Sequence, residues 1–237
     1  MNTNKFFQLS ESCRLIKDVF LCSEEMKALY SKLTEAEQKS LINHYIIDNP
    51  PYAFMSIPLL FDQVKQFIGK ELEVSVDCIK LIGSAKQGFS IDPNQYGKPF
   101  SEKSDMDFTI IDVTLFEKLK TDFETWQQAY DSGEVFPRNK TEEYYWNENI
   151  KGLPNNIKRG FVDPHKIPLF SSVCPTNNKI SSVLTRVQAN LSLYNIKTKG
   201  LSLRVYKDYT SFYKQIKLNT DYCMSKIRYC FKKCVRE

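Results

Sequence analysis

The chain has 237 residues, of which 42% are hydrophobic and 26% are charged, with only 8 Gly and 10 Pro. This length fits one large domain or two small ones, and the composition excludes a disordered, collagen-like or low-complexity protein. The longest apolar stretches, such as residues 57–61, are far shorter than the roughly 18 residues of a membrane span, and charges interrupt the first 20 residues. The seven cysteines form no CxxC pair, which favours reduced thiols. We therefore expect a cytoplasmic protein with no signal peptide and no membrane insertion.

Charge is distributed unevenly along the chain. Residues 1–150 contain 16 Lys and Arg against 24 Asp and Glu, whereas residues 151–237 contain 17 against 4. Six tyrosines are interleaved with the basic residues of the second part, a pattern that would attract polyanions such as nucleoside triphosphates or nucleic acid. A solvated helical face that balances an acidic first part would look the same. Charge therefore indicates a class of partner and no reaction.

Apolar residues at helical spacing dominate the first 73 residues. They predict three helices, over residues 10–33, 34–48 and 57–69. Thr34 and Glu37 match a capping box at the start of the second helix, and Gly69 is expected at the C-terminal cap of the third. We expect these helices to form an N-terminal layer, residues 1–73, packed on the rest of the molecule.

The middle of the chain alternates strand and helix signals. Two strands are predicted over residues 74–82 and 106–113, separated by a loop rich in turn residues, and a helix follows over residues 114–130. Residues 133–172 are harder to assign, and only residues 159–162 predict a short strand. Together, residues 74–172 indicate the core of an α+β fold with a small mixed sheet flanked by helices.

The C-terminal part, residues 173–237, is expected to complete that core. It predicts a helix over residues 180–196, a strand over residues 200–206 and a basic helix over residues 208–233. Asp208 is expected to cap the last helix. No internal repeat is present.

The candidate site residues lie where the first two predicted strands meet a turn. After the first strand, Gly83 allows a tight turn that exposes backbone N–H groups and the Ser84 hydroxyl to a phosphate, and Lys86 adds positive charge nearby. Asp105 and Asp107 are two residues apart on the next strand, so both carboxylates face the same side. Such a pair repels unless a cation lies between the two groups, and Mg²⁺ prefers oxygen ligands. Either motif alone is common in ordinary turns and hairpins.

In this order, the two motifs resemble the DNA polymerase beta-like nucleotidyltransferase superfamily, whose signature is a Gly-Ser turn followed by Asp-x-Asp on the next strand. The first motif, Gly83-Ser84-x-Lys86-x-Gly88, is close to the Gly-Ser-x-Arg-Arg-Gly of the polymerase branch. The resemblance covers roughly residues 79–111. The loop between the motifs, residues 89–103, is longer than in the polymerase motif.

This resemblance implies a nucleotidyltransferase core. Gly83, Ser84 and Lys86 would bind the triphosphate of an NTP or dNTP, while the catalytic residues Asp105 and Asp107 would hold Mg²⁺ or Mn²⁺.

The superfamily usually supplies a third carboxylate from a later strand, and here the chain departs from the pattern. Ser202 takes that place in the strand over residues 200–206, and Arg204 is a candidate for orienting the site. Asp163 follows an apolar, strand-like pair and is the best substitute as a metal ligand, although Asp-Pro is also an ordinary turn.

The resemblance implies a template-independent enzyme that moves a nucleoside monophosphate to a hydroxyl, with a nucleic acid 3′ end or a growing oligonucleotide as the preferred acceptor. A fainter resemblance to bacterial nucleotidyltransferases that make nucleotide signals in phage defence adds a protein effector as an expected partner. Two alternatives stay open. One is nucleotidylation of a protein or tRNA, as in toxin-like members. The other is a nucleotide-binding or nucleic-acid-binding module that has lost catalysis, which Ser202 would explain.

Overall fold

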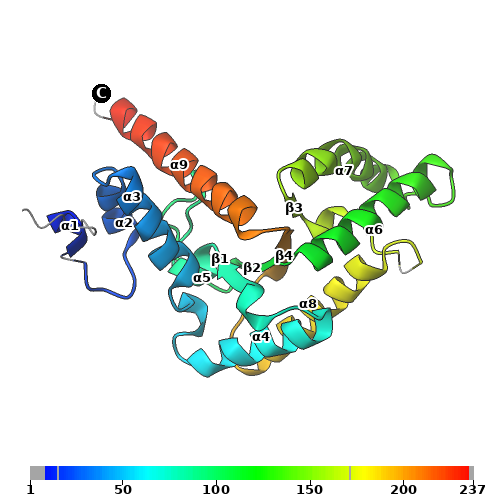
Figure 1. Cartoon of the computed structure of the whole chain (residues 1–237), viewed down its shortest axis with the longest axis horizontal. Helices are drawn as coiled ribbons and strands as arrows, with labels where there is room; N and C mark the ends of the chain where they lie inside the picture. The colour runs from blue at the N-terminus through cyan, green and yellow to red at the C-terminus, as the bar shows by residue number, and fades with distance from the viewer. Residues whose placement is uncertain (1–8, 15, 171, 235–237) are drawn as a thin grey trace, which may run out of the picture.

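The computed structural model describes residues 9–14, 16–170 and 172–234, with side chains described as far as Ser225 (Figure 1). Within these residues the chain has an α+β fold in which helices flank a four-stranded mixed sheet, so the predicted fold class is confirmed at this level. The strands lie in the order β1-β2-β4-β3. Their bounds are β1 Ile79–Ile82, β2 Asp105–Ile111, β3 Phe161–Val162 and β4 Gly200–Tyr206.

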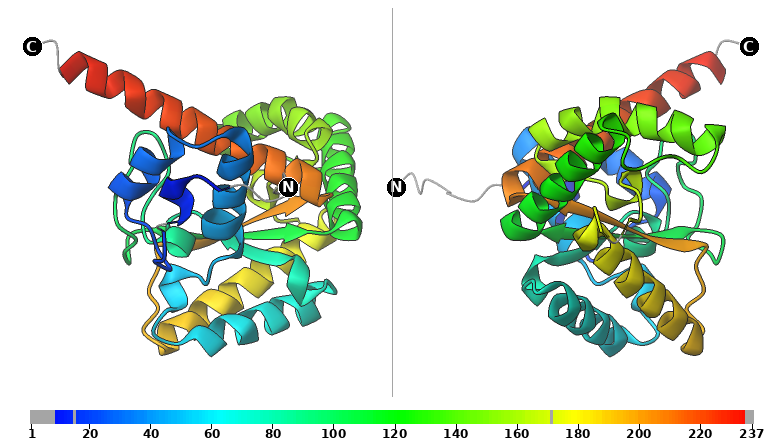
Figure 2. Two further views of the ribbon diagram at one scale, coloured as in Figure 1. Left: turned by 60° about the vertical axis from the view of Figure 1, so that its left-hand side comes forward. Right: turned by 90° about the vertical axis from the view of Figure 1, so that its right-hand side faces the viewer.

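The central strands β2 and β4 are parallel, and each edge strand is antiparallel to its neighbour. Side chains on alternate positions point to opposite faces. One face carries Met106, Phe108 and Ile110 of β2 together with Leu203 and Val205 of β4. Helices cover this face, namely α4 Pro58–Leu72, α6 Val113–Asp131 and α8 Pro175–Leu193. In Figures 1 and 2, α4 and α8 run side by side beneath the sheet.

The opposite face has a second apolar core at one end and polar residues at the other. Tyr206 and Phe161 pack there against the N-terminal helices and the last helix. These helices are α2 Ser23–Tyr30, α3 Glu35–Leu41, the π-helix η1 Ile42–Asp48 and α9 Tyr209–Cys234. The C-terminal end of α9 projects away from the body of the molecule (Figure 2). Because the apolar core covers only part of this face, the polar ends of β2 and β4 stay accessible.

The single helix predicted over residues 10–33 is wrong. Apart from residue 15, which lies outside the described residues, the segment forms a short helix, α1 Glu11–Arg14, then irregular chain, then α2. A second capping box, made by Cys22 and Glu25, starts α2 afresh. The irregular segment is stabilised through its backbone, since the Tyr45 hydroxyl donates to the Asp18 carbonyl at 3.0 Å. The capping box of Thr34 and Glu37 is confirmed at the start of α3.

The third helix, α4, is confirmed but ends later than predicted, and Gly69 is not its cap. Glu73 takes the left-handed cap conformation, with φ of 60°, and Gly69 lies one turn inside the helix. A Cβ on Gly69 would lie 2.9 Å from the Val74 carbonyl oxygen, so this glycine allows the chain to pack back on the helix. The following residues include the 3₁₀ turn η3 Val76–Cys78, so the first strand starts only at Ile79.

A long helix, α7 Lys140–Lys158, occupies part of the segment that the sequence left unassigned. Asn139 caps it by accepting a hydrogen bond from the Glu142 N–H. Pro154 lies inside this helix, and Trp146 packs edge-on against Trp126 of α6 with ring centroids 5.5 Å apart. Burial of such aromatic rings outweighs the poor helix propensity of proline.

The C-terminal elements are confirmed with small shifts. The helix predicted over residues 180–196 is α8, which starts at Pro175, and the strand over residues 200–206 matches β4. Asp208 precedes α9 and accepts a hydrogen bond from the Ser211 N–H at 2.7 Å, so its capping role is confirmed.

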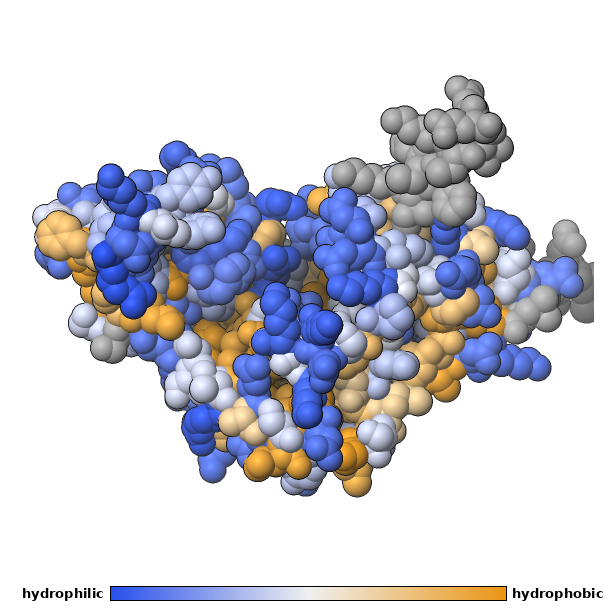
Figure 3. Space-filling model, turned by 180° about the vertical axis from the view of Figure 1, so that it is seen from behind, coloured by the Kyte–Doolittle hydropathy of each residue, from blue (hydrophilic) through white to orange (hydrophobic). Residues whose placement is uncertain are grey.

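Polar side chains cover most of the surface seen from behind, and hydrophobic ones gather in its lower part (Figure 3). Leu59 at the start of α4 and Leu193 at the end of α8 are among the most exposed large apolar residues. Within the described part of the chain, no helix combines the length and apolar composition needed to cross a bilayer.

Candidate functional site

The two carboxylates of the Asp-x-Asp motif lie at the start of β2, on its polar face. Asp105 and Asp107 alternate there with the buried Met106 and Phe108, which anchor the strand in the core. The Asp107 carboxyl group is largely enclosed, and burial raises its pKa, as does the nearby charge of Asp105. The raised pKa reflects the cost of placing two like charges close together in a poorly solvated place, which a bound cation would relieve.

The Gly-Ser turn lies directly against this pair. In the antiparallel register, Ile82 at the end of β1 is opposite Asp107, so the turn that follows reaches the same edge of the sheet. Gly83 has φ of 72° and ψ of −157°. A Cβ at this position would lie 2.9 Å from Oδ2 of Asp107. Only glycine adopts this backbone conformation readily, and here it also prevents a clash with the carboxylate.

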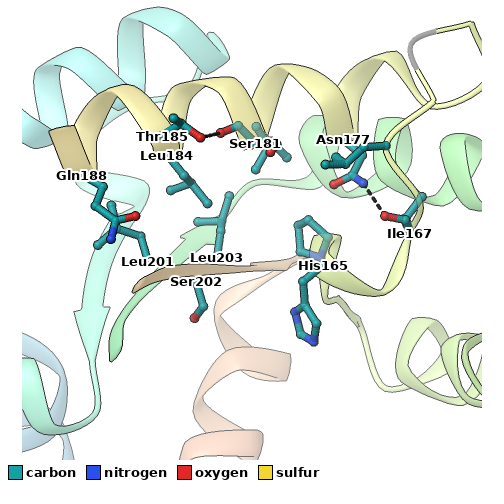
Figure 4. Close-up of a pocket in the computed structure, with 13 residues that line it drawn as sticks. His165, Ile167, Asn177, Ser181, Leu184, Thr185, Gln188, Leu201, Ser202 and Leu203 are labelled. Carbon is teal, nitrogen blue, oxygen red and sulfur yellow. Dashed lines mark hydrogen bonds between the residues drawn. The ribbon is translucent and has the colours of Figure 1, made fainter. Parts of the chain in front are cut away.

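Ser202 is the neighbour of Asp107 on the parallel strand β4. Its hydroxyl donates a hydrogen bond to Oδ1 of Asp107 at 2.6 Å, which opposes the rise in the pKa of that carboxyl group. Figure 4 shows that Leu201 and Leu203 point toward α8, whereas Ser202 points to the other side of the strand. Leu201, Ser202 and Leu203 all line a separate pocket of about 330 Å³ beneath α8. Ser202 therefore places a hydroxyl beside Asp107, at the position where the resemblance implies a third carboxylate.

A polar hollow of about 590 Å³ opens at the Gly-Ser turn and the Asp-x-Asp motif, and Ser202 is not among the residues that line it. Gly83, Ser84, Asp105 and Asp107 all line it, so the structure brings four of the six expected site residues together. The size falls within the range of about 300–1,000 Å³ that is usual for small-molecule sites.

The long loop between the two motifs forms much of the wall of the hollow. It folds as a hairpin-like unit in which the Ser90 N–H donates to the Lys98 carbonyl at 2.9 Å and the Phe100 N–H donates to Gly88 at 2.8 Å. The Tyr96 hydroxyl donates to the Ser23 carbonyl at 2.6 Å, which ties the loop to the N-terminal part of the chain. The extra loop length therefore does not separate the two motifs.

Lys86, one of the expected phosphate ligands, is not among the residues that line the hollow. Its side chain is buried, with 4% of the residue exposed, and its ammonium donates a hydrogen bond to the Asn49 carbonyl. Burial lowers the pKa of Lys86 to about 8. The structure thus directs Lys86 to the segment that follows η1, where it contacts the N-terminal part of the chain.

Asp163, the expected substitute for the third carboxylate, is also placed elsewhere. It follows β3, and one of its oxygens lies 2.5 Å from Nε of Arg204. The other lies 3.3 Å from both the Lys166 ammonium and the Asn156 side-chain amide. Arg204 stacks over Phe161 at 4.7 Å from the ring centroid. The carboxylate of Asp163 is thus engaged by cations, and Asp163 is not among the residues that line the hollow.

The donor set at the hollow suits a hard divalent cation only in part. Asp105 and Asp107 supply carboxylate oxygens of the kind that Mg²⁺ takes together with water and phosphate oxygens. Among the residues described, no group of three or more His, Cys, Asp or Glu side chains is placed to hold a metal ion. The residues present therefore fit a metal that shares its coordination with a ligand's own oxygens.

Three lysines at the hollow, Lys98, Lys103 and Lys199, were not singled out in the sequence. Lys199 comes immediately before β4 and Lys103 comes two residues before the parallel strand β2, at the end of the sheet where Asp105 is paired with Gly200. The Lys199 N–H donates to the Ser104 carbonyl at 3.0 Å, which joins these two segments. The sequence does show a lysine shortly before each of these two strands. This pattern becomes informative only once the strands are known to be parallel neighbours.

No family model, curated protein or solved structure matches this chain. The functional argument therefore rests on the residues and their geometry.

Proposed function

We propose that the protein is a metal-dependent nucleotidyltransferase that uses an NTP or dNTP. The observation that carries this proposal is the convergence of the Gly83-Ser84 turn with Asp105 and Asp107 at one polar hollow, despite the long loop between them. A turn with exposed donors beside a pair of carboxylates can receive a phosphate chain together with the cation that accompanies it. A nucleotidyltransferase core is the finer fold assignment that goes with this proposal.

In the proposed reaction, the oxygen of an acceptor hydroxyl forms a bond to the α-phosphorus of the nucleotide. The bond between that phosphorus and the oxygen bridging to the β-phosphate breaks, pyrophosphate leaves, and the proton of the acceptor passes to water. Asp105 and Asp107 would hold Mg²⁺ or Mn²⁺, which supplies charge stabilisation and in-line positioning in phosphoryl transfer. Ser84 and the backbone of its turn would bind phosphate oxygens.

The acceptor we favour is a nucleic acid 3′ end or a growing oligonucleotide, because the last 87 residues carry 17 Lys and Arg against 4 Asp and Glu. A protein or tRNA acceptor differs only in where the nucleotide ends up. We also propose that the protein acts in phage defence together with a separate effector protein.

The first experiment measures pyrophosphate release from each ribo- and deoxyribonucleoside triphosphate with Mg²⁺ or Mn²⁺, with products separated by size and by attachment to protein. We expect Asp105→Asn and Asp107→Asn to lower release at least about 100-fold, because metal-assisted stabilisation amounts to several kcal/mol. The control is Asp62→Asn, whose carboxylate lies on α4 and pairs with Lys65 at 2.8 Å. Equal rates in the parent and both site variants would contradict the proposed chemistry.

A second candidate is a protein that binds a nucleotide but no longer transfers it. Ser202 favours this candidate, because a hydroxyl that donates to Asp107 replaces the expected third carboxylate. Under it, the parent binds a metal-nucleotide complex and releases no pyrophosphate from any substrate.

The Ser202→Asp variant tests how the absence of a third carboxylate affects metal binding. We expect the variant to melt at a lower temperature without divalent cations, because its new charge faces Asp107, and to recover on addition of Mn²⁺. Mn²⁺ affinity measured by calorimetry should rise by roughly tenfold, a change that corresponds to about 1.4 kcal/mol. Ser202→Asn is the matched control, because asparagine has nearly the same size as aspartate but carries no charge. Equal Mn²⁺ affinity in the Asp and Asn variants would show that position 202 does not face the metal.

A further inference from the structure

The hollow presents positive charge that the motifs do not account for. Lys98, Lys103 and Lys199 line it alongside three carboxylates, those of Asp92, Asp105 and Asp107. Counted together, these six side chains have no net charge. Once a divalent cation offsets the charges of Asp105 and Asp107, the three lysines exceed the charge of Asp92 by two. A bound triphosphate brings more negative charge than a single divalent cation neutralises, and the remainder needs cations from the protein.

Lys199 is placed to interact with either partner of such a complex. Its ammonium lies 3.5 Å from Oδ2 of Asp105, and both side chains are well exposed, at 69% and 50%. An exposed ion pair of this length contributes little to stability, so Lys199 can exchange Asp105 for another anion at small cost. A metal ion bound by Asp105 would compete with Lys199 for the same carboxylate.

Of the three lysines, Lys103 has the fewest side-chain interactions within the described residues. Its backbone is held by a hydrogen bond from its N–H to the Ser101 hydroxyl at 3.3 Å. Its ammonium makes no hydrogen bond or ion pair to any of the residues described, whereas the ammonium of Lys98 binds the Gln95 side chain at 3.2 Å. A lysine that lines a polar hollow on an ordered loop and lacks an internal partner is available to a ligand.

We propose that Lys103 and Lys199 bind the terminal phosphates of the nucleotide, in the role that the sequence assigned to Lys86. Lys199 leaves Asp105 when that carboxylate binds the metal and then contacts a phosphate oxygen. This inference rests on the proposed function and names the part of the substrate that these two side chains recognise.

The test measures ligand binding to the full chain by calorimetry, for Lys103→Gln, Lys199→Gln and the parent. Because each variant loses a hydrogen bond to a charged group, it should bind the nucleoside triphosphate at least about tenfold more weakly in the presence of Mg²⁺. The affinity for the corresponding monophosphate should change less than about twofold, since it lacks the terminal phosphates. Lys120→Gln, on α6 and paired with Glu117 and Glu124, is the matched control and should bind both ligands as the parent does.

A second readout uses Mn²⁺ without nucleotide. Lys199→Gln should bind Mn²⁺ more tightly than the parent, because it removes the cation that competes for Asp105, while the same variant binds the triphosphate more weakly. Opposite signs for the two ligands are not expected of a variant that merely perturbs the fold.

The outcomes separate the two proposals. A parent protein that binds no triphosphate overturns the proposed function and this inference with it. Triphosphate binding that is unchanged in both lysine variants overturns the inference alone. Loss of affinity for a short single-stranded oligonucleotide, with triphosphate affinity preserved, also overturns it, because the lysines would then bind a nucleic acid backbone.

Discussion

Gly83 has a backbone conformation that favours glycine and lies directly against the Asp107 carboxylate. Its φ of 72° and ψ of −157° belong to a region that is essentially restricted to glycine, and its missing side chain leaves room for Asp107. We expect Gly83→Ala to lower the free energy of unfolding by about 1–3 kcal/mol, measured by urea denaturation. Mn²⁺ binding should weaken as well, because the carboxylate has to move.

The chain contains a matched control for this substitution. Gly152 lies inside α7, and a Cβ built there meets no atom within 4 Å. Gly152→Ala should therefore stabilise the protein by about 0.5–1 kcal/mol, as expected for alanine in a helix interior. If both variants changed stability alike, the close approach of Gly83 to Asp107 would not be the cause.

At the residue scale, the sequence predicted local placement better than long-range contacts. It identified Gly83, Asp105 and Asp107 because their motifs depend on local geometry, namely a turn and the alternation of a strand. It misplaced Lys86, whose long side chain is equally compatible with the hollow and with the Asn49 carbonyl. The choice depends on which surface covers the lysine, and that surface belongs to the N-terminal part of the chain.

At the scale of elements, the parallel pairing of β2 with β4 does most to form the site. It sets Ser202 beside Asp107 and Gly200 beside Asp105, although more than 90 residues separate each pair in sequence. The strand over residues 200–206 was predicted with correct bounds, because its apolar residues alternate with polar ones. Its neighbour in the sheet could not be derived from that alternation.

The two errors among the helices have opposite directions, since one predicted helix was too long and one helix was missed. The helix predicted over residues 10–33 is interrupted because Tyr45, from η1, binds the backbone of the intervening segment. Helix α7 was missed for the opposite reason, since Gly152 and Pro154 suggest a break that tertiary packing overrides. In both cases contacts distant in sequence outweigh local propensity.

At the scale of the whole molecule, the described part of residues 1–73 does not form one layer: α4 packs on one face of the sheet, whereas α2, α3 and η1 share a core with α9 on the other face. The buried Tyr30 of α2 donates a hydrogen bond to Oδ1 of Asp221 on α9 at 2.5 Å. Lys217 pairs with the same carboxylate at 2.9 Å. This contact links segments 191 residues apart in the sequence.

Tyr30→Phe tests this link. Loss of a hydrogen bond to a charged group should destabilise the protein by about 1.5–3 kcal/mol and speed amide hydrogen exchange in α2 and in the first half of α9. Tyr194→Phe is the control, because that tyrosine is 47% exposed and its hydroxyl makes no hydrogen bond to any of the residues described. Unchanged exchange in α9 would mean that apolar packing alone holds the helix against the N-terminal helices.

The sequence by itself determined the features that depend on near neighbours: the α+β composition, the strand positions, the caps at Thr34 and Asp208, and the two halves of the proposed site. Their physical basis is short-range, in hydrogen bonds to adjacent turns and in the periodicity of side chains. Only the tertiary structure decided that Lys86 is buried, that Asp163 pairs with Arg204, and that Lys103 and Lys199 face the hollow. A charged side chain can reach many partners, and packing between distant segments selects which of them it meets.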